Sequence, residues 1–243
     1  MVTWNLFHGR DHPGKGMPDA TDSLLPEFSE FLDGLPWEIA LLQEAPPRWL
    51  DDLGRASRAS GALGLTSRNE LPSLRAAIAD RLPDLIKSGE GGSNMTLARA
   101  PARIEVVERH RLAWRPERRA LLLTRIAAPG GRSIAVANMH LSVPSTGQGH
   151  AEVVRAAELA DAFAGGDPLI LGGDLNLRPV HHAPAFEELE RRFGLAAPTG
   201  PKAIDHLLVR GLEVVEKPRA RKHAAGPLQL SDHAPVTAAF GMR

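Results

Sequence analysis

Short runs of apolar and β-branched residues alternate along the chain with longer stretches in which apolar residues recur at helical spacing. This pattern predicts an α/β (α+β) protein. Helical spacing marks residues 74–86 and 151–163. The strand-like runs cover residues 2–6, 37–43, 95–98, 104–110, 120–126, 133–141, 168–172, 204–209 and 234–240.

The four central runs, between residues 95 and 141, follow one another with short turns, which predicts antiparallel pairing among them. The flanking runs resemble strand–helix–strand units. A mixed sheet arrangement covered by helices accommodates both patterns. No linker-like segment or internal repeat divides the chain, so we expect a single domain over residues 1–243.

Composition narrows the possible functions. The 243 residues are 43% hydrophobic, enough to close one sizeable core. The 29 basic and 29 acidic side chains balance, so the chain lacks the strong positive field typical of many nucleic-acid-binding proteins. A neutral enzyme can still concentrate positive charge around one cleft. The absence of cysteine excludes disulfides, thiolate metal sites and cysteine nucleophiles.

No run is apolar over the length of a membrane span, so we expect no membrane association. A strand is already predicted from residue 2, with no basic and apolar leader before it. If Met1 is the natural start, the protein is expected to be cytoplasmic. A monomer is favoured, although the sequence does not set the oligomeric state.

Small polar or ionisable residues stand at the ends of the predicted strands. They fall in residues 4–6, 42–44, 138–141, 172–176, 204–206 and 231–235. Each segment alone is typical of an ordinary turn or helix cap. Their combination indicates a reaction centre, because the apolar runs before them form a scaffold with these side chains at its rim.

The residue types suit a metal ion and a phosphate group. Hard cations such as Mg²⁺ take oxygen ligands, usually including one or two carboxylates, which Glu44 and Asp232 could supply. The amides of Asn5 and Asn176 can donate to phosphate oxygens without adding negative charge.

Asp205 and His233 could form a carboxylate–imidazole pair, which holds one tautomer and stabilises the imidazolium. Phosphoryl transfer depends mainly on positioning and on charge neutralisation. The whole set therefore indicates phosphoester hydrolysis.

Several of these segments also form an ordered signature: Trp4-Asn5, Leu42-Gln43-Glu44, His140-Leu141, Gly173-Asp174-Leu175-Asn176 and Ser231-Asp232-His233-Ala234-Pro235. In this order and at these intervals, across residues 4–235, they resemble the endonuclease/exonuclease/phosphatase superfamily with its deoxyribonuclease-like fold. The resemblance implies a four-layer sandwich, with two mixed β-sheets packed face to face and helices outside. It also implies an active site where strand ends from both sheets meet.

The resemblance further implies roles for the candidate residues. Glu44 and Asp232 would hold Mg²⁺ or Mn²⁺, and Asn5 beside them would orient Glu44 or contact the metal or the phosphate. Asp174 would align or deprotonate the attacking water.

His140 and Asn176 would grip the phosphate oxygens, again by resemblance. His233, steered by Asp205, would act as general acid or base, or would stabilise the transition state. Whether Asp174 or His233 is the general base stays open at this stage.

Two further stretches have undecided roles. His8 and Arg10 follow the first predicted strand, where a loop should border the site, so a functional and a structural role are equally favoured. Lys217, Arg219, Arg221 and Lys222 predict a basic loop, which is either an ordinary solvated loop or a substrate-binding one. We take Arg219 and Arg221 as candidate substrate-binding residues.

The leading hypothesis is a nuclease that hydrolyses phosphodiester bonds. The first alternative is a phosphatase or phosphodiesterase acting on a small-molecule, lipid or sugar phosphate. The absence of tyrosine disfavours abasic-site repair, because some repair members of the superfamily use a tyrosine near the phosphate. A catalytically inactive binding module is disfavoured, because no residue of the catalytic set is missing.

Overall fold

The computed structural model describes residues 1–11, 23–66, 91–115, 117–128, 130–196, 199–222, 224–225 and 228–242. The helix expected at residues 74–86 lies outside these ranges. Among the described residues, no helix is long and apolar enough to cross a membrane.

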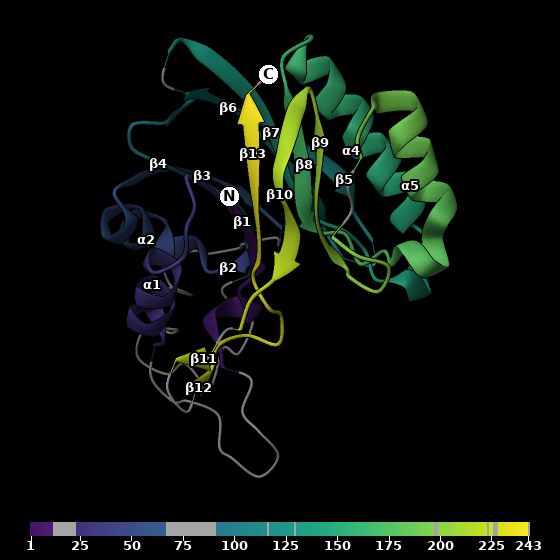
Figure 1. Cartoon of the computed structure of the whole chain (residues 1–243). Helices are drawn as coiled ribbons and strands as arrows, with labels where there is room; N and C mark the ends of the chain where they lie inside the picture. The colour runs from purple at the N-terminus through teal and green to yellow at the C-terminus, as the bar shows by residue number, and fades with distance from the viewer. Residues whose placement is uncertain are drawn as a thin grey trace.

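Two mixed β-sheets form the centre of the molecule (Figure 1). The first has six strands, in the order β10 (Leu212–Ala220), β13 (Val236–Met242), β1 (Val2–Asn5), β2 (Ile39–Ala45), β4 (Ser93–Arg99) and β3 (Ala59–Leu65). The second has five, in the order β5 (Arg103–Ala113), β6 (Arg119–Ala128), β7 (Arg132–His140), β8 (Leu169–Asp174) and β9 (Asp205–Arg210). Each sheet contains one parallel pair, β1–β2 and β7–β8, and the other pairs are antiparallel.

Helices cover the outer faces of the sheets, α1 (Leu25–Asp33) and α2 (Leu50–Ser57) on the first sheet, and α4 (Gly149–Ala164) and α5 (Pro179–Phe193) on the second (Figure 1). Three clusters of buried apolar side chains separate the four layers, one under each helix pair and one between the sheets. β11 (Ala224–Ala225) and β12 (Leu228–Gln229) form a short antiparallel hairpin separate from the two sheets. The four-layer sandwich expected from the motifs is therefore confirmed.

The apolar periodicity of the sequence predicted the position of most strands, but not which strands pair with each other. The run at residues 95–98 is β4, which pairs with β2 and β3 and not with β5, so the prediction of antiparallel pairing across all four central runs was wrong. β4 is buried along almost its whole length, as a central strand should be, whereas β5 is largely exposed at the margin of its own sheet. The antiparallel order β5–β6–β7 was predicted correctly.

The basic stretch predicted as a loop is mostly a strand, since Lys217 and Arg219 lie in β10. Pro218 interrupts the strand pattern there, and the pairing of β10 with β13 shifts register on both sides of Glu216. A proline is tolerated at this place because β10 is the edge strand of its sheet. The elements α1, α2, β3 and α5 were also not predicted.

A buried amide network connects the two sheets. The side chain of Asn138, in β7, donates to the backbone carbonyl oxygens of Met95 (2.9 Å) and Leu42 (3.3 Å) in the first sheet. Its own amide oxygen accepts from Nε2 of Gln43 at 2.8 Å, and Gln43 also donates to Oγ1 of Thr3 at 3.1 Å. These bonds fix how the strand ends of the two sheets face each other.

Gly173 provides the first testable consequence. Its φ of 129° belongs to the region that favours glycine, and a Cβ atom there would collide with the backbone oxygen of Met139 in β7. We expect Gly173→Ala to lower the free energy of unfolding by at least about 3 kcal/mol, because strain and a backbone collision add. Urea denaturation would measure the loss.

Gly165 offers the matched control, because its φ is also positive, at 58°, but a Cβ there would have open space around it. Gly165→Ala should cost only about 1 kcal/mol, the conformational part alone. Equal losses in the two variants would contradict the steric explanation for Gly173.

Candidate active site

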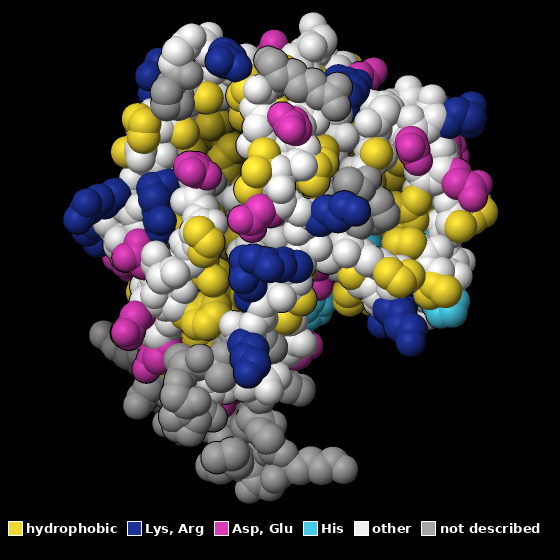
Figure 2. Space-filling view, in the orientation of Figure 1, with side chains coloured by type: hydrophobic (Ala, Val, Ile, Leu, Met, Phe, Trp, Pro, Cys, Tyr) yellow, Lys and Arg dark blue, Asp and Glu magenta, His cyan; other side chains and the backbone are white. Residues whose placement is uncertain are grey.

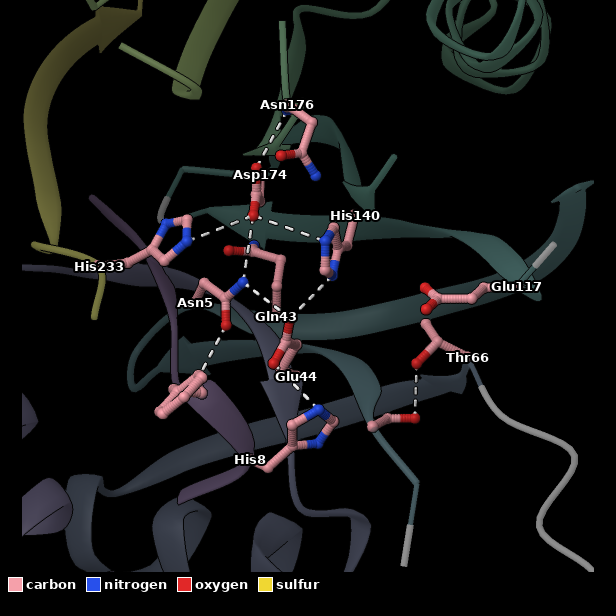
Figure 3. Close-up of polar contacts among 12 residues, drawn as sticks. Asn5, His8, Gln43, Glu44, Thr66, Glu117, His140, Asp174, Asn176 and His233 are labelled. Carbon is pink, nitrogen blue, oxygen red and sulfur yellow. Dashed lines mark hydrogen bonds and ion pairs between the residues drawn. The ribbon is translucent and has the colours of Figure 1, made fainter. Parts of the chain in front are cut away.

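The ends of strands from both sheets meet at one place, and most of the candidate residues lie there (Figure 3). Asn5 ends β1, and Glu44 is the residue before the end of β2. From the other sheet, His140 and Asp174 end the parallel strands β7 and β8 and stand directly opposite each other in register. Register alone thus brings residues far apart in sequence to one rim.

Asn5 connects the two halves of the site. Its Nδ2 atom donates to Oε1 of Glu44 at 3.2 Å and to Oδ2 of Asp174 at 3.1 Å. Its amide oxygen accepts from the backbone N–H of Phe7 at 3.0 Å, and this fixes the orientation of the amide because a backbone N–H can only donate. Asn5 therefore turns its nitrogen, and not an oxygen ligand, toward the carboxylates.

Glu44 carries a stabilised negative charge. A register shift in β2 and a φ of 48° at Glu44 turn its side chain out of the strand pattern, toward the opening between the sheets. Burial alone would raise the pKa of Glu44, but the hydrogen bond from His8, then electrostatic interactions with His140 and His8, and last the hydrogen bond from Asn5 lower it to about 2. The carboxyl is thus ionised throughout the physiological pH range.

Asp174 has the opposite electrostatic character, although it is only 2% exposed in the same centre. Burial, and after it the negative charge of Asp205, raises the pKa of Asp174 to about 7. Asp205 lies directly opposite it on the neighbouring strand β9. A carboxyl with this pKa exchanges a proton readily near neutral pH.

His233 and Asp205 form the expected pair, with 2.9 Å between Nδ1 of His233 and Oδ2 of Asp205. The other ring nitrogen of His233 lies 3.8 Å from Oδ2 of Asp174. Burial alone would lower the pKa of His233, but the hydrogen bond to Asp205 and the nearby carboxylates raise it to about 9. The imidazole is therefore protonated at neutral pH.

A local turn aims His233 at the centre. Ser231 has a φ of 66°, and its hydroxyl donates to the backbone oxygen of Asn5 at 2.7 Å and accepts from the backbone N–H of His233 at 3.0 Å. The indole of Trp4 donates to the carbonyl of His233 at 2.8 Å. These contacts tie the loop before β13 to the end of β1.

His140 bridges the two carboxylates without carrying a charge. Its Nδ1 lies 3.6 Å from Oε1 of Glu44, and its Nε2 lies 3.5 Å from Oδ2 of Asp174. Burial, and then the positive charge of Arg119, lowers the pKa of His140 to about 3. His140 is thus a neutral donor and acceptor at the middle of the site.

Asn176 lies next to this group in a left-handed turn. Strand β8 ends at Asp174 and Asn176 has a φ of 52°, so the two side chains are not aligned by a shared strand, as they would be had the chain stayed extended. The backbone N–H of Asn176 donates to Oδ1 of Asp174 at 3.0 Å, and its side-chain nitrogen donates to the carbonyl of Leu141 at 3.0 Å.

Three candidates lie further out. Asp232 is exposed, and its Oδ1 lies 3.5 Å from the hydroxyl oxygen of Ser231. Arg219 lies 3.6 Å from Glu216 in an exposed ion pair, and Nε of Arg221 donates to Oγ1 of Thr237 at 2.7 Å. Within the described residues, no hydrogen bond or ion pair joins either arginine to the central group.

Two groups of side chains have donors suited to a divalent cation. One is centred on the ionised Glu44. In the other, Asp174, Asp205 and His233 place ligand atoms within 4.8 Å of one another, and Oδ1 of Asp205 is buried with no hydrogen-bond partner in the described part of the chain. Both groups therefore offer donor atoms that suit a divalent cation, and Glu44 is the carboxylate whose pKa is lowered.

One contact was left undecided by the sequence. Nε2 of His8 lies 3.0 Å from Oε2 of Glu44, so His8 belongs to the site (Figure 3). The signal in the sequence was only its position after the first strand. A single histidine in a loop has no periodic pattern from which its direction can be predicted.

The model of the Endonuclease/Exonuclease/phosphatase family matches residues 2–233. This chain belongs to that family. The family recognised from the ordered motifs is confirmed, and its members are hydrolases that act on phosphoesters. Among curated proteins, no sequence match is found.

Several solved structures have the same fold. A functionally unknown conserved protein from Enterococcus faecalis V583 has a TM-score of 0.74 at 16% identity, covering 100% of this chain and 99% of that one. A mannosyl-6-phosphatase from Bacteroides thetaiotaomicron VPI-5482 has a TM-score of 0.65 at 16% identity and 98% coverage of both. D. rerio TDP2, complexed with single strand DNA product, has 0.67 at 13%, covering 99% of this chain and 98% of that one. Such identities show the fold alone.

The His233–Asp205 pair gives a testable pH dependence in this family member. We expect Asp205→Asn to lower the pKa of His233 by roughly 1 unit or more, because the variant removes a charged acceptor and leaves the burial that favours the neutral ring. NMR titration of the imidazole Cε1–H resonance would measure the shift. The resonance of His181, which is exposed on α5, serves as the internal control. An unchanged titration of His233 would contradict the pairing.

Proposed function

We propose that this chain is a divalent-metal-dependent phosphodiesterase that cleaves nucleic acid. One observation carries the proposal: four differently charged groups converge around Asn5. They are the ionised Glu44, the neutral His140, the carboxyl of Asp174 with a pKa near 7 and the imidazolium of His233. Such a set matches the needs of in-line displacement at phosphorus.

Glu44 and Asp232 would hold Mg²⁺ or Mn²⁺, and Asn5 would keep the Glu44 carboxylate in place. When bound, the cation would neutralise charge on the phosphate oxygens and polarise the phosphorus centre. His140 and Asn176 would orient the same oxygens by hydrogen bonds. The exposed Asp232 has room to move toward an ion, because it is tied only weakly to Ser231.

The pKa values favour Asp174 as the base. Asp174 accepts the proton of a water molecule whose oxygen attacks phosphorus, and the bond between phosphorus and the leaving oxygen breaks on the opposite side. His233 is already protonated and cannot serve as base at neutral pH, so it donates its Nε2 proton to the leaving oxygen. Asp205 holds the imidazole in position and stabilises its charge.

Nucleic acid is the proposed substrate because the TDP2 structure shows this fold in complex with single strand DNA product. Arg219 and Arg221 are proposed to contact its backbone beyond the scissile phosphate. A small phosphate ester is the second candidate, favoured by a specific observation. On the face that carries β10 and β13, Lys and Arg side chains are scattered among Asp and Glu side chains and form no continuous basic field (Figure 2).

The first test of this function is a screen with and without metal. We expect hydrolysis of bis-p-nitrophenyl phosphate and single-stranded DNA in the presence of Mg²⁺ or Mn²⁺. We expect no hydrolysis in excess EDTA, because the oxygen ligands can bind the cation but cannot replace it. Undiminished turnover in EDTA would overturn the metal requirement. Turnover confined to p-nitrophenyl phosphate and sugar phosphates would replace the nuclease by a phosphatase.

The second test is a double-mutant cycle on the small diester. His233→Ala should lower kcat on the order of 10²-fold or more, as expected for a positioned acid. Asp205→Asn should cost less alone and add little to His233→Ala, because residues that act as one unit are non-additive. KM should move far less than kcat. Fully additive losses would show that Asp205 acts independently of His233.

A further inference from the structure

The loop that carries His8 has a strained backbone. The short helical turn η1 (Phe7–Gly9) contains consecutive residues with positive φ, 49° at Phe7, 57° at His8 and 73° at Gly9. Left-handed backbone costs roughly 1–2 kcal/mol at each non-glycine residue. Strain of this kind persists only where the surroundings enforce it, and it concentrates at functional sites.

The surroundings do enforce it here. A Cβ atom at Gly9 would collide with the ring of Trp49, so the turn is packed tightly against a buried indole. The backbone N–H of Gly9 donates to the carbonyl of Leu6 at 2.8 Å, and that of Arg10 donates to the carbonyl of Phe7 at 3.1 Å. These contacts hold the turn in a shape that points His8 at Glu44 (Figure 3).

His8 and Asn5 each contact a different oxygen of the Glu44 carboxylate. Nε2 of His8 faces Oε2 at 3.0 Å, whereas Nδ2 of Asn5 faces Oε1. Gly92 leaves room for this contact, because a Cβ there would lie 3.3 Å from Cε1 of His8 and 3.2 Å from Cα of Glu44. The side chains of His8 and Glu44 are 28% and 21% exposed, so an ion can reach both from solvent.

The spacing of these atoms matches neighbouring ligands on one ion. In an octahedral site with bonds of about 2.1 Å, adjacent ligand atoms lie about 3.0 Å apart. In the tautomer that carries its hydrogen on Nδ1, the imidazole presents a lone pair at Nε2, the atom that faces Glu44. An imidazole nitrogen also changes the preference of the site, since Mg²⁺ favours oxygen ligands and Mn²⁺ accepts nitrogen more readily.

We propose that His8 is a direct ligand of the catalytic cation, together with Glu44, and that it makes the site selective for Mn²⁺ over Mg²⁺. This inference rests on the proposed function only in that Glu44 binds the cation. The rival role for His8 is a hydrogen bond that holds Glu44 from outside the coordination sphere.

The test measures metal binding without substrate. Chelator-treated protein is titrated with Mn²⁺ while electron paramagnetic resonance follows the free ion, and Mg²⁺ is then added as competitor. His8→Asn is the informative variant, because asparagine tolerates left-handed backbone and removes the imidazole. His181→Asn is the matched control, since it removes an exposed imidazole on α5.

We expect His8→Asn to weaken Mn²⁺ binding at least about tenfold and Mg²⁺ binding much less. Nitrogen-14 modulation of the bound Mn²⁺ in electron spin echo spectra should be present in the wild type and in His181→Asn, and should be lost in His8→Asn. Unchanged modulation in His8→Asn would overturn the proposal. Weaker binding without any nitrogen coupling in the wild type would also overturn it, in favour of the outer hydrogen bond.

Two other results would separate failure of the proposed function from failure of the His8 assignment. If Glu44→Gln bound Mn²⁺ as well as the wild type, the cation would not be held at Glu44, and both proposals would fall. Tight Mn²⁺ binding with nitrogen coupling but no hydrolysis of any phosphoester would leave the ligand assignment standing and remove only the activity.

Discussion

The active centre depends on the buried amide network between the sheets. Asn138 is two residues before His140 on β7, and Gln43 directly precedes Glu44 on β2, so the hydrogen bond between Asn138 and Gln43 fixes the strand ends that carry both site residues. Each of these buried polar groups would cost about 1–3 kcal/mol if left without a partner. Sliding one sheet over the other is therefore penalised directly beneath the site, where an apolar interface alone would resist it weakly.

Above this network, the ionised carboxylate of Glu44 lies on one side of the site, and Asp174 and His233 lie on the other. The Glu44 side is strongly acidic in character, with a carboxyl that stays ionised, and the Asp174 side holds a carboxyl and an imidazole whose pKa values are shifted upward. Neutral His140 and the amide of Asn5 stand between the two sides. In the proposed mechanism, a cation would bind on the Glu44 side while Asp174 and His233 exchange protons on the other side.

Structures of the same fold include a mannosyl-6-phosphatase and a protein complexed with single strand DNA product, so the fold does not by itself choose the substrate. Arg219 on β10 and Arg221 just after it are candidate residues of this chain that lie away from the group around Asn5.

The sequence by itself determined the chemistry and the family. Motifs such as Leu42-Gln43-Glu44 and Ser231-Asp232-His233 give residue types, order and spacing, and apolar runs give the strands, because period and burial are local properties. Tertiary structure decided which strands pair, that β10 is a strand despite Pro218, and that His8 contacts Glu44. Only folding shows that Asn5 reaches both Glu44 and Asp174, which lies 169 residues away in sequence. Contacts of this kind arise from the packing of whole sheets, and no local pattern of residues encodes them.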